Sequence, residues 1–284
     1  VLPFKYLAAT LTDTYWTGWS YNLLNGKFFF SNDVSFLYIL KSLIFKSPEY
    51  FIFLYIIFFF TFLFFNNSYK KAFKNFNYKI VFVIINITYP TISLIIIPYP
   101  IYDGMRLFLW TLPLLSIIPS LALFFLFKNS AHNFFKFINL IVFILFIGFM
   151  INFIKITPYH YTYLNYFAGK KIDVNFKFEN DYWGGSIKEL TSKFDLRNKK
   201  ILISSCGINE GIAKKYLKMR GFSKARFVSL DKAEYVIMTN RTVYLNKEIE
   251  NINNITTCFE KYKGEDIVTV SRNKVLLSTI RKIK

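Results

Sequence analysis

Four long apolar runs without a single charged residue most constrain what this chain can fold into. They cover Tyr50–Phe65, Ile80–Pro98, Leu107–Phe127 and Phe137–Ile154. A helix needs about 20 predominantly apolar residues to cross the hydrocarbon core of a bilayer. The number and length of these runs favour an α-helical integral membrane protein with about four transmembrane helices over a soluble protein with buried core helices.

The charged residues divide the chain into two unequal parts. Residues 1–160 hold 12 of the 36 lysines and arginines and 4 of the 17 aspartates and glutamates, whereas residues 161–284 hold 24 and 13. This division predicts a membrane part followed by a water-soluble part. We expect an extracytoplasmic loop with an interfacial helix in residues 1–48, the four spans in 49–155, an aromatic juxtamembrane segment in 156–185 and a small soluble α/β domain in 186–284.

The lysines also predict how the spans are oriented. The loops Asn66–Lys79 and Lys128–Lys136 carry lysines and no acidic residue. By the positive-inside rule, these two loops are cytoplasmic. The loop at 99–106, residues 1–48 and the C-terminal part then lie on the opposite side. We expect the inner membrane of a bacterium, with the C-terminal domain on the periplasmic or exterior side; the lumen of a eukaryotic compartment is the equivalent alternative.

Two segments suit the surface of a membrane. Val34–Phe45 is apolar apart from Lys41 and is followed by Pro48, which fits an interfacial helix, although an ordinary amphipathic surface helix explains it nearly as well. Tyr159–Phe167 contains four tyrosines and is typical of an aromatic belt at the membrane edge.

The C-terminal part alternates between strand and helix patterns. Ser186 and Glu189 have the S-x-x-E spacing of a capping box, which predicts that a helix begins there. This order predicts one small α/β domain with a partly parallel sheet. The further predicted elements are strands at Lys200–Ser205, Ala225–Leu230 and Tyr235–Thr239, a helix at Asn209–Arg220 that ends before Gly221, and a hairpin of Asp266–Ser271 and Val275–Thr279.

The stretch from Tyr102 to Arg106 places two ionisable side chains between two charge-free runs. Ionisable groups at such a position are candidates for function. A guanidinium matches the geometry of phosphate, so Arg106 is a candidate for binding a lipid-linked phosphate. A structural interpretation is equally good: Asp103 caps the next helix at its N-terminus, or pairs with Arg106 three residues away.

Cysteines and histidines indicate no metal centre. Cys206 and Cys258 are the only cysteines, and both fall in the domain expected outside the cytoplasm, where a disulfide persists. A bridge between them and two partly buried thiols are both possible. His132 and His160 fall in different parts of the chain, and the cysteine spacing does not suggest zinc. We expect no resident cofactor, while a divalent metal ion stays open.

Nucleotides and nucleic acids are both disfavoured as ligands. The strand at Lys200–Ser205 is followed by neither a G-x-G-x-x-G motif nor a P-loop. The net charge of +19 is not accompanied by a basic stripe on a known nucleic-acid fold. A basic surface facing anionic membrane lipids explains this charge better.

Three stretches together resemble the C-terminal half of the GT-C class of membrane glycosyltransferases, and in particular family 39, the protein O-mannosyltransferase-like enzymes. The resemblance covers most of the chain, but Leu107 stands where the family pattern has histidine. The three stretches are Tyr15-Trp16-Thr17-Gly18-Trp19 with Asn25-Gly26, Tyr102 to Leu109, and Tyr163 to Gly169 followed by Asp181-Tyr182-Trp183-Gly184.

The resemblance implies transfer of a sugar from a polyprenyl-phosphate donor to a protein or glycan acceptor outside the cytoplasm. In this interpretation Arg106, with Asp103 and Tyr102, binds or positions the donor phosphate. Such enzymes carry their catalytic acid in the first external loop, which we expect before Val1 in a chain that lacks its N-terminal portion. A carboxylate there would activate the acceptor hydroxyl as a general base. The residues implied on the substrate side are Trp16, Trp19, Asp181 and Trp183.

Two other classes of function compete with this one. A non-catalytic membrane protein that binds a partner during envelope assembly would have the same spans and the same soluble domain. A transporter is disfavoured because the expected spans contain no ionisable residue and no matched pair of broken helices.

Overall fold

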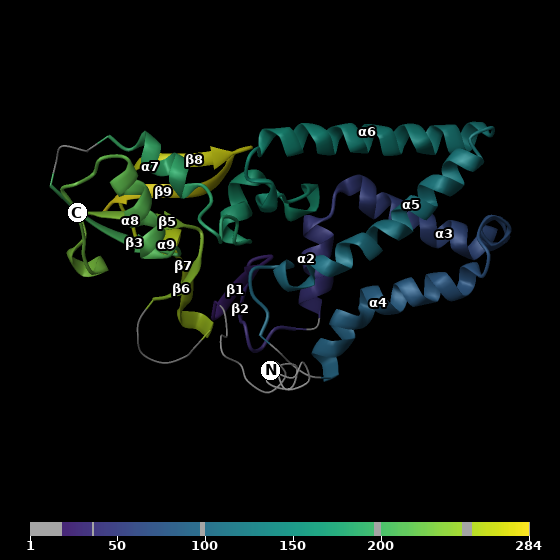
Figure 1. Ribbon diagram of the computed structural model, residues 1–284, viewed down its shortest axis with the longest axis horizontal. Helices are drawn as coiled ribbons and strands as arrows, with labels where there is room; N and C mark the ends of the chain where they lie inside the picture. Colours follow the sequence, from purple (N-terminus) through teal and green to yellow (C-terminus); the bar gives the residue numbers. More distant parts are fainter. Residues whose placement is uncertain (1–18, 36, 97–99, 196–199, 246–251, 284) are drawn as a thin grey trace, which may run out of the picture.

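The computed structural model describes residues 19–35, 37–96, 100–195, 200–245 and 252–283. Figure 1 shows the long helices at one end of the molecule and a sheet domain at the other, with a short hairpin and one helix between them. Trp16, expected on the substrate side, lies outside the described residues.

The long helices are α3 (Glu49–Ala72), α4 (Phe76–Ile96), α5 (Leu112–Lys128) and α6 (Asn133–Lys155), with the 3₁₀ helix η1 (Arg106–Thr111) leading into α5. Among the described residues, α3, η1 with α5, and α6 are long and apolar enough to cross a membrane. The expected span Ile80–Pro98 falls largely on α4, a helix of 21 residues that is not one of these three.

Aromatic packing holds these helices together. Tyr69 of α3 is fully buried, donates or accepts a 2.7 Å hydrogen bond with Thr61, and stacks on Phe76 of α4. Phe125 of α5 packs against the same tyrosine. Much of the remaining apolar surface is exposed; only 6% of the apolar stretch of α6 is buried. A surface of this kind suits a lipid environment.

The expected loop Asn66–Lys79 is mostly helix, which corrects the prediction. The α3 helix continues to Ala72, and α4 begins at Phe76. Lys70 and Lys71 occupy the last turn of α3, where the carbonyl ends of the helix favour positive charge.

The middle of the molecule contains a hairpin that the sequence did not reveal. Strands β1 (Tyr21–Leu24) and β2 (Lys27–Phe30) pair in an antiparallel sense through Asn25 and Gly26. Both turn residues have positive φ, as a two-residue type I′ turn requires. Helix α2 (Leu37–Lys46) follows, close to the expected interfacial helix Val34–Phe45.

The segment between α6 and the sheet domain consists of short 3₁₀ helices. They are η2 (His160–Thr162), η3 (Tyr166–Ala168) and η4 (Lys171–Phe176). Leu164, Ala168 and Val174 pack with Tyr38 and Ile39 of α2 in one buried cluster. The segment therefore joins the long apolar helices to the hairpin and α2.

The C-terminal domain is built on a five-stranded sheet in the order β4-β3-β5-β9-β8. Strands β3 (Ile201–Cys206), β4 (Ala225–Phe227) and β5 (Tyr235–Thr239) run parallel, while β8 (Glu265–Arg272) and β9 (Val275–Lys282) form an antiparallel hairpin beside β5. The predicted partly parallel sheet is thus present. The strand predicted at Ala225–Leu230 ends at Phe227, and the last residue of the prediction, Leu230, begins η5 (Leu230–Lys232).

Helices cover both faces of this sheet. Leu190 of α7 (Ile187–Lys193) and Leu217 of α8 (Glu210–Met219) pack on one face against Ile203 and Ile237. On the other face, Cys258 at the start of α9 (Cys258–Lys261) packs on Val236. The remaining elements are β6 (Thr242–Tyr244), η6 (Ile252–Asn254) and β7 (Ile255–Thr257), with β6 and β7 forming a small antiparallel pair.

The capping box predicted at Ser186 and Glu189 is not formed. The Ser186 hydroxyl donates to Asp181 and hydrogen-bonds Ser278 instead of capping α7. Glu189 instead pairs with Arg272 of β8 at 2.5 Å. A capping box does occur at Thr257 and Glu260, at the start of α9.

Candidate functional site

The loop before η1 turns sharply at Asp103 and Gly104, whose φ angles are +57° and +64°. The N-cap of η1 is Met105 and no side chain caps it, so the interpretation of Asp103 as a helix cap is wrong. The i,i+3 ion pair is present: Asp103 Oδ2 lies 3.2 Å from Nη1 of Arg106. Tyr102 is buried in the same loop.

The second oxygen of Asp103 binds an arginine that the sequence did not single out. Nη1 of Arg241 lies 2.5 Å from Asp103 Oδ1, and both side chains are about 95% buried. Arg241 follows the buried strand β5, and its guanidinium stacks over the ring of Trp19 at 4.4 Å. Because 138 residues separate the two partners, no local pattern in the sequence points to this contact.

Glu179 completes this buried charge cluster. It accepts hydrogen bonds from the backbone N–H and the hydroxyl of Thr242, at 2.9 and 2.8 Å, and lies 3.9 Å from Nε of Arg241. Burial raises the pKa of Glu179, and the positive charge of Arg241 opposes that rise. Asp103, Glu179 and Arg241 together join the loop before η1 to the sheet domain.

The structure also joins Cys206 and Cys258 by a disulfide, next to this cluster. The N–H of Cys258 donates to the carbonyl of Arg241 at 2.8 Å. Gly207 has a φ of +75°, and a Cβ there would lie only 2.4 Å from Cβ of Arg241. The disulfide and this glycine therefore fix the backbone that presents Arg241.

A groove of about 340 Å³ lies beside the charge cluster; most of its surface is apolar, and we call it the polar groove because the cations of Lys46 and Arg106 line it. It is formed where the end of α2, η1 with the start of α5, and the segment after α6 meet the loop before α7. Its wall combines two cations with several aromatic rings and a few apolar side chains: Leu43, Lys46, Ser47, Met105, Arg106, Leu109, Leu112, His160, Tyr161, Tyr163, Tyr182 and Trp183.

The cations of the groove are placed over its aromatic rings. The guanidinium of Arg106, whose side chain is 43% exposed, lies 5.7 Å from the centroid of Trp183. The ammonium of Lys46 lies 5.2 Å from the centroid of Tyr182. Burial lowers the pKa of Lys46 to about 8, against the attraction of Asp103 and Glu179. Burial and the nearby Asp103 raise the pKa of Tyr182 to about 12.

Three of the residues expected on the substrate side are described by the structure, and they do not share one location. Trp183 is 46% exposed and lines the groove. Asp181 is fully buried and accepts hydrogen bonds from the N–H groups of Gly185 and Ser186 at 2.8 and 2.9 Å, so it shapes the loop that presents Trp183. Trp19 lies under Arg241 and donates its indole N–H to the carbonyl of Thr242 at 2.9 Å.

An apolar groove of about 540 Å³ runs between α3 and α6, and it is lined mainly by side chains such as Ile52, Phe53 and Phe149. Tyr163 separates it from the polar groove, because its hydroxyl donates to Glu49 at 3.0 Å and its ring packs edge-on against Phe149. Tyr163 of the polar groove thus contacts Glu49 and Phe149 of the apolar groove.

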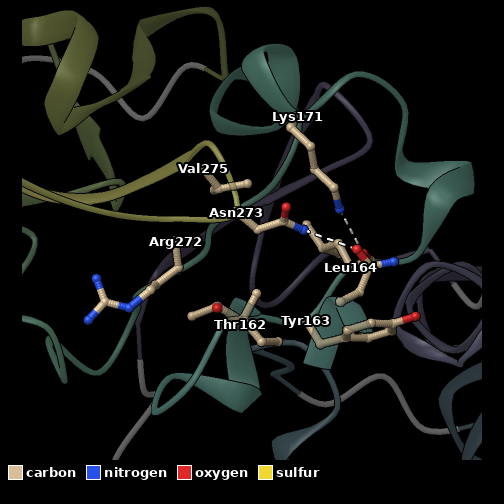
Figure 2. A pocket seen from close by; sticks show the side chains of 9 residues that line it. Thr162, Tyr163, Leu164, Lys171, Arg272, Asn273 and Val275 are labelled. Carbon is tan, nitrogen blue, oxygen red and sulfur yellow. Dashed lines mark hydrogen bonds between the residues drawn. The ribbon is translucent and has the colours of Figure 1, made fainter. Parts of the chain in front are cut away.

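A third, much smaller space lies where the β8–β9 turn meets the segment after α6. Figure 2 shows Arg272 and Asn273 of the turn beside Thr162 and Leu164, with Lys171 donating to the carbonyl of Leu164 at 3.2 Å. Its volume is about 10 Å³, which is close to the smallest space that holds one water molecule. It is too small for a substrate. The residues around it join the sheet domain to α6, because Asn273 donates to Asn152 of that helix.

Among the described residues, no group of three or more histidine, cysteine, aspartate or glutamate side chains is arranged to hold a metal ion. Comparison of the chain with protein-family models, curated proteins and solved structures gave no match.

Proposed function

We propose that this chain is part of a GT-C class membrane glycosyltransferase that takes a sugar from a polyprenyl-phosphate donor and transfers it to a protein or glycan acceptor outside the cytoplasm. The observation that carries this proposal is the exposed guanidinium of Arg106 in the groove at the start of the apolar segment formed by η1 and α5. An anion attached to a long hydrocarbon chain needs such a place, since its charge stays at the surface while its chain stays in lipid.

The proposal includes four spans, with α4 as the fourth, and an orientation that puts the groove and the sheet domain on the periplasmic side of a bacterial inner membrane. The lysines at the opposite ends of α3, α4 and α5 support this orientation. The apolar groove between α3 and α6 supports it as well, because it meets the polar groove at Tyr163.

In the proposed reaction, a general base removes the proton from an acceptor hydroxyl and the oxygen attacks the anomeric carbon of the sugar. The bond between that carbon and the phosphate oxygen breaks, and its electron pair stays on that oxygen. The lipid phosphate therefore leaves as a monoester with one more negative charge than it carried in the donor. A positive group fixed near that oxygen stabilises the transition state. Arg106 is proposed for this role, and the exposed ring of Trp183 is proposed to pack against the sugar.

The general base is proposed to be a carboxylate of an external loop, as the family resemblance implies. Asp103 and Glu179 are unsuited to that role because both are buried and interact with Arg241.

The test is transfer of labelled sugar from a polyprenyl-phosphate donor by the full-length protein in membranes. We expect Arg106→Ala to lower transfer at least 100-fold and Arg106→Lys to lower it less, with unchanged amounts of folded protein. Arg226→Ala is the matched control, because Arg226 is exposed on β4 and lies outside the groove. Transfer by Arg106→Ala at the level of the control would refute the role of Arg106.

A donor-binding measurement separates the two leading classes of function. Full-length protein that binds polyprenyl phosphate through Arg106 and transfers no sugar with any donor would instead support the non-catalytic envelope-assembly protein. Transfer that depends on Arg106 supports the enzyme.

A further inference from the structure

We propose that Lys46 is a second phosphate-binding residue of the polar groove, acting with Arg106 on the same phosphodiester, and that it makes donor binding depend on pH. This inference rests on the proposed function, since it assigns a second contact to the same site. It is carried by the position of the Lys46 ammonium, by the glycine beside it and by the absence of a carboxylate at ion-pair distance from Lys46 within the part of the chain that the structure describes.

Lys46 is the last residue of α2 and points into the groove rather than into solvent. Its ammonium lies over Tyr182, and the guanidinium of Arg106 lies over the adjacent Trp183. The centroids of these two rings are only 5.3 Å apart. The two cations therefore face one groove from neighbouring aromatic supports, which is an arrangement that suits one doubly contacted anion.

Gly104 provides the space that Lys46 occupies. A Cβ at Gly104 would lie 3.0 Å from Nζ of Lys46, closer than ordinary van der Waals contact. The ammonium thus lies directly over the backbone of the turn that also carries Asp103. The turn brings Lys46 close to the segment from which Arg106 emerges.

The acidic groups near Lys46 are already bound to arginines. Asp103 pairs with Arg106 and Arg241 through its two oxygens, and Glu179 is held by Thr242 and lies near Arg241. Within the described residues, Lys46 has no carboxylate within ion-pair distance. A half-buried ammonium without an ion-pair partner attracts an anion more strongly than a fully solvated one, because less water screens it.

The titration of Lys46 gives the site its pH dependence. Its pKa is lowered to about 8 by burial, although Asp103 and Glu179 act in the opposite direction. Tyr182, whose pKa is raised to about 12, stays neutral near Lys46, and the guanidinium groups of Arg106 and Arg241 lie over Trp183 and Tyr182. His160, Tyr161 and Tyr163 also line the groove. Lys46 is then mostly charged at pH 7 and mostly neutral at pH 9.

The experiment measures binding of farnesyl methyl phosphate to the purified full-length protein in nanodiscs from pH 6.5 to 9.5. This phosphodiester keeps one negative charge over that range, so its own titration does not contribute. We expect the affinity of the wild type to fall about tenfold between pH 7 and pH 9, which corresponds to loss of one charge-assisted hydrogen bond. Farnesol measures binding of the hydrocarbon chain alone, and dimethyl phosphate measures binding of a free phosphodiester.

Three variants separate the possible results. Lys46→Gln should bind about tenfold more weakly at pH 7 and show no dependence on pH, whereas Lys46→Arg should keep binding at pH 9. Lys41→Gln, on the same helix but outside the groove, should match the wild type. Thermal unfolding of each variant checks that it is folded. Lys46→Arg keeps a positive charge at this position, so its result still tests the role of Lys46 if Lys46→Gln does not fold.

The outcomes distinguish this inference from the proposed function. If Arg106→Ala loses the phosphodiester while Lys46→Gln keeps the affinity and pH profile of the wild type, the role of Lys46 is overturned and the proposed function stands. If the wild type binds farnesyl methyl phosphate no better than farnesol, the proposed function and the role of Lys46 are both overturned.

Discussion

Replacing Arg241 by methionine should destabilise the sheet domain more than any exposed charge change. The side chains of Arg241, Asp103 and Glu179 are 4%, 5% and 7% exposed, so methionine would leave Glu179 without its arginine and Asp103 with Arg106 alone. Removing one partner of a buried ion pair costs about 3–5 kcal/mol, because a charge stays buried without compensation.

Hydrogen exchange of the amides in β5 and β9 measures this loss, since those strands lie in the core of the domain and open only when it unfolds. Lys214→Met is the control: Lys214 pairs with Glu210 four residues earlier, and its side chain is 56% exposed. Exposed pairs of this kind contribute about 0.3–0.5 kcal/mol. If the free energy of unfolding of Arg241→Met lies within 1 kcal/mol of that of Lys214→Met, the buried cluster does not stabilise the domain.

The loss of stability caused by Arg241→Met should also depend on pH. Burial raises the pKa of Glu179, and Arg241→Met removes the main charge that opposes this rise. When a carboxyl group has a higher pKa in the folded protein than in the unfolded chain, it stabilises the folded protein at pH values below its unfolded pKa. This stabilisation is lost as the pH rises through the pKa of the folded protein. Arg241→Met should therefore differ more from the wild type at pH 8 than at pH 5, and Glu179→Gln in the same background should reduce the difference.

Three further changes test other parts of the structure. Gly207→Ala should destabilise the domain by at least about 2 kcal/mol in calorimetry, since the new Cβ would collide with Arg241 and the φ of +75° disfavours alanine. Cys206→Ser should lower the free energy of unfolding by about 4 kcal/mol in oxidising buffer, because the bridge to Cys258 closes a loop with a sequence separation of 52, and alkylation without reductant should modify the wild type at neither cysteine. Glu189→Gln should destabilise at neutral pH; hydrogen bonds from basic neighbours outweigh desolvation and lower the Glu189 pKa to about 2, so the difference from wild type should shrink as pH falls from 4.5 towards 2.

Elements defined by local patterns could be predicted from the sequence. Strand β5 lies at the predicted Tyr235–Thr239, and α8 falls within the predicted Asn209–Arg220. The two-residue turn at Asn273 and Lys274 connects the expected hairpin, with both φ angles positive. Apolar runs, alternation and turn residues determine these elements within a few positions.

The candidate site was harder to predict because distant contacts form it. Arg106 is distinctive in the sequence because it lies between two apolar runs. Arg241 and Lys46 lie at the ends of a strand and a helix, where basic residues are common. Asp181 belongs to a motif that suggested substrate contact, yet four donors surround it in the structure. Burial and partners of this kind depend on tertiary packing, which a local pattern does not encode.

The contact between Asp103 and Arg241 also sets an order of events during synthesis of the chain. Arg241 is made 138 residues after Asp103, and at about 5–20 residues per second that interval lasts roughly 7–28 s. During that time η1, α5 and α6 are made, while Asp103 is without its contact to Arg241. The buried charge cluster becomes complete only when the last third of the chain folds back onto the loop, so a ribosome that stalls before Arg241 leaves Asp103 paired with Arg106 alone.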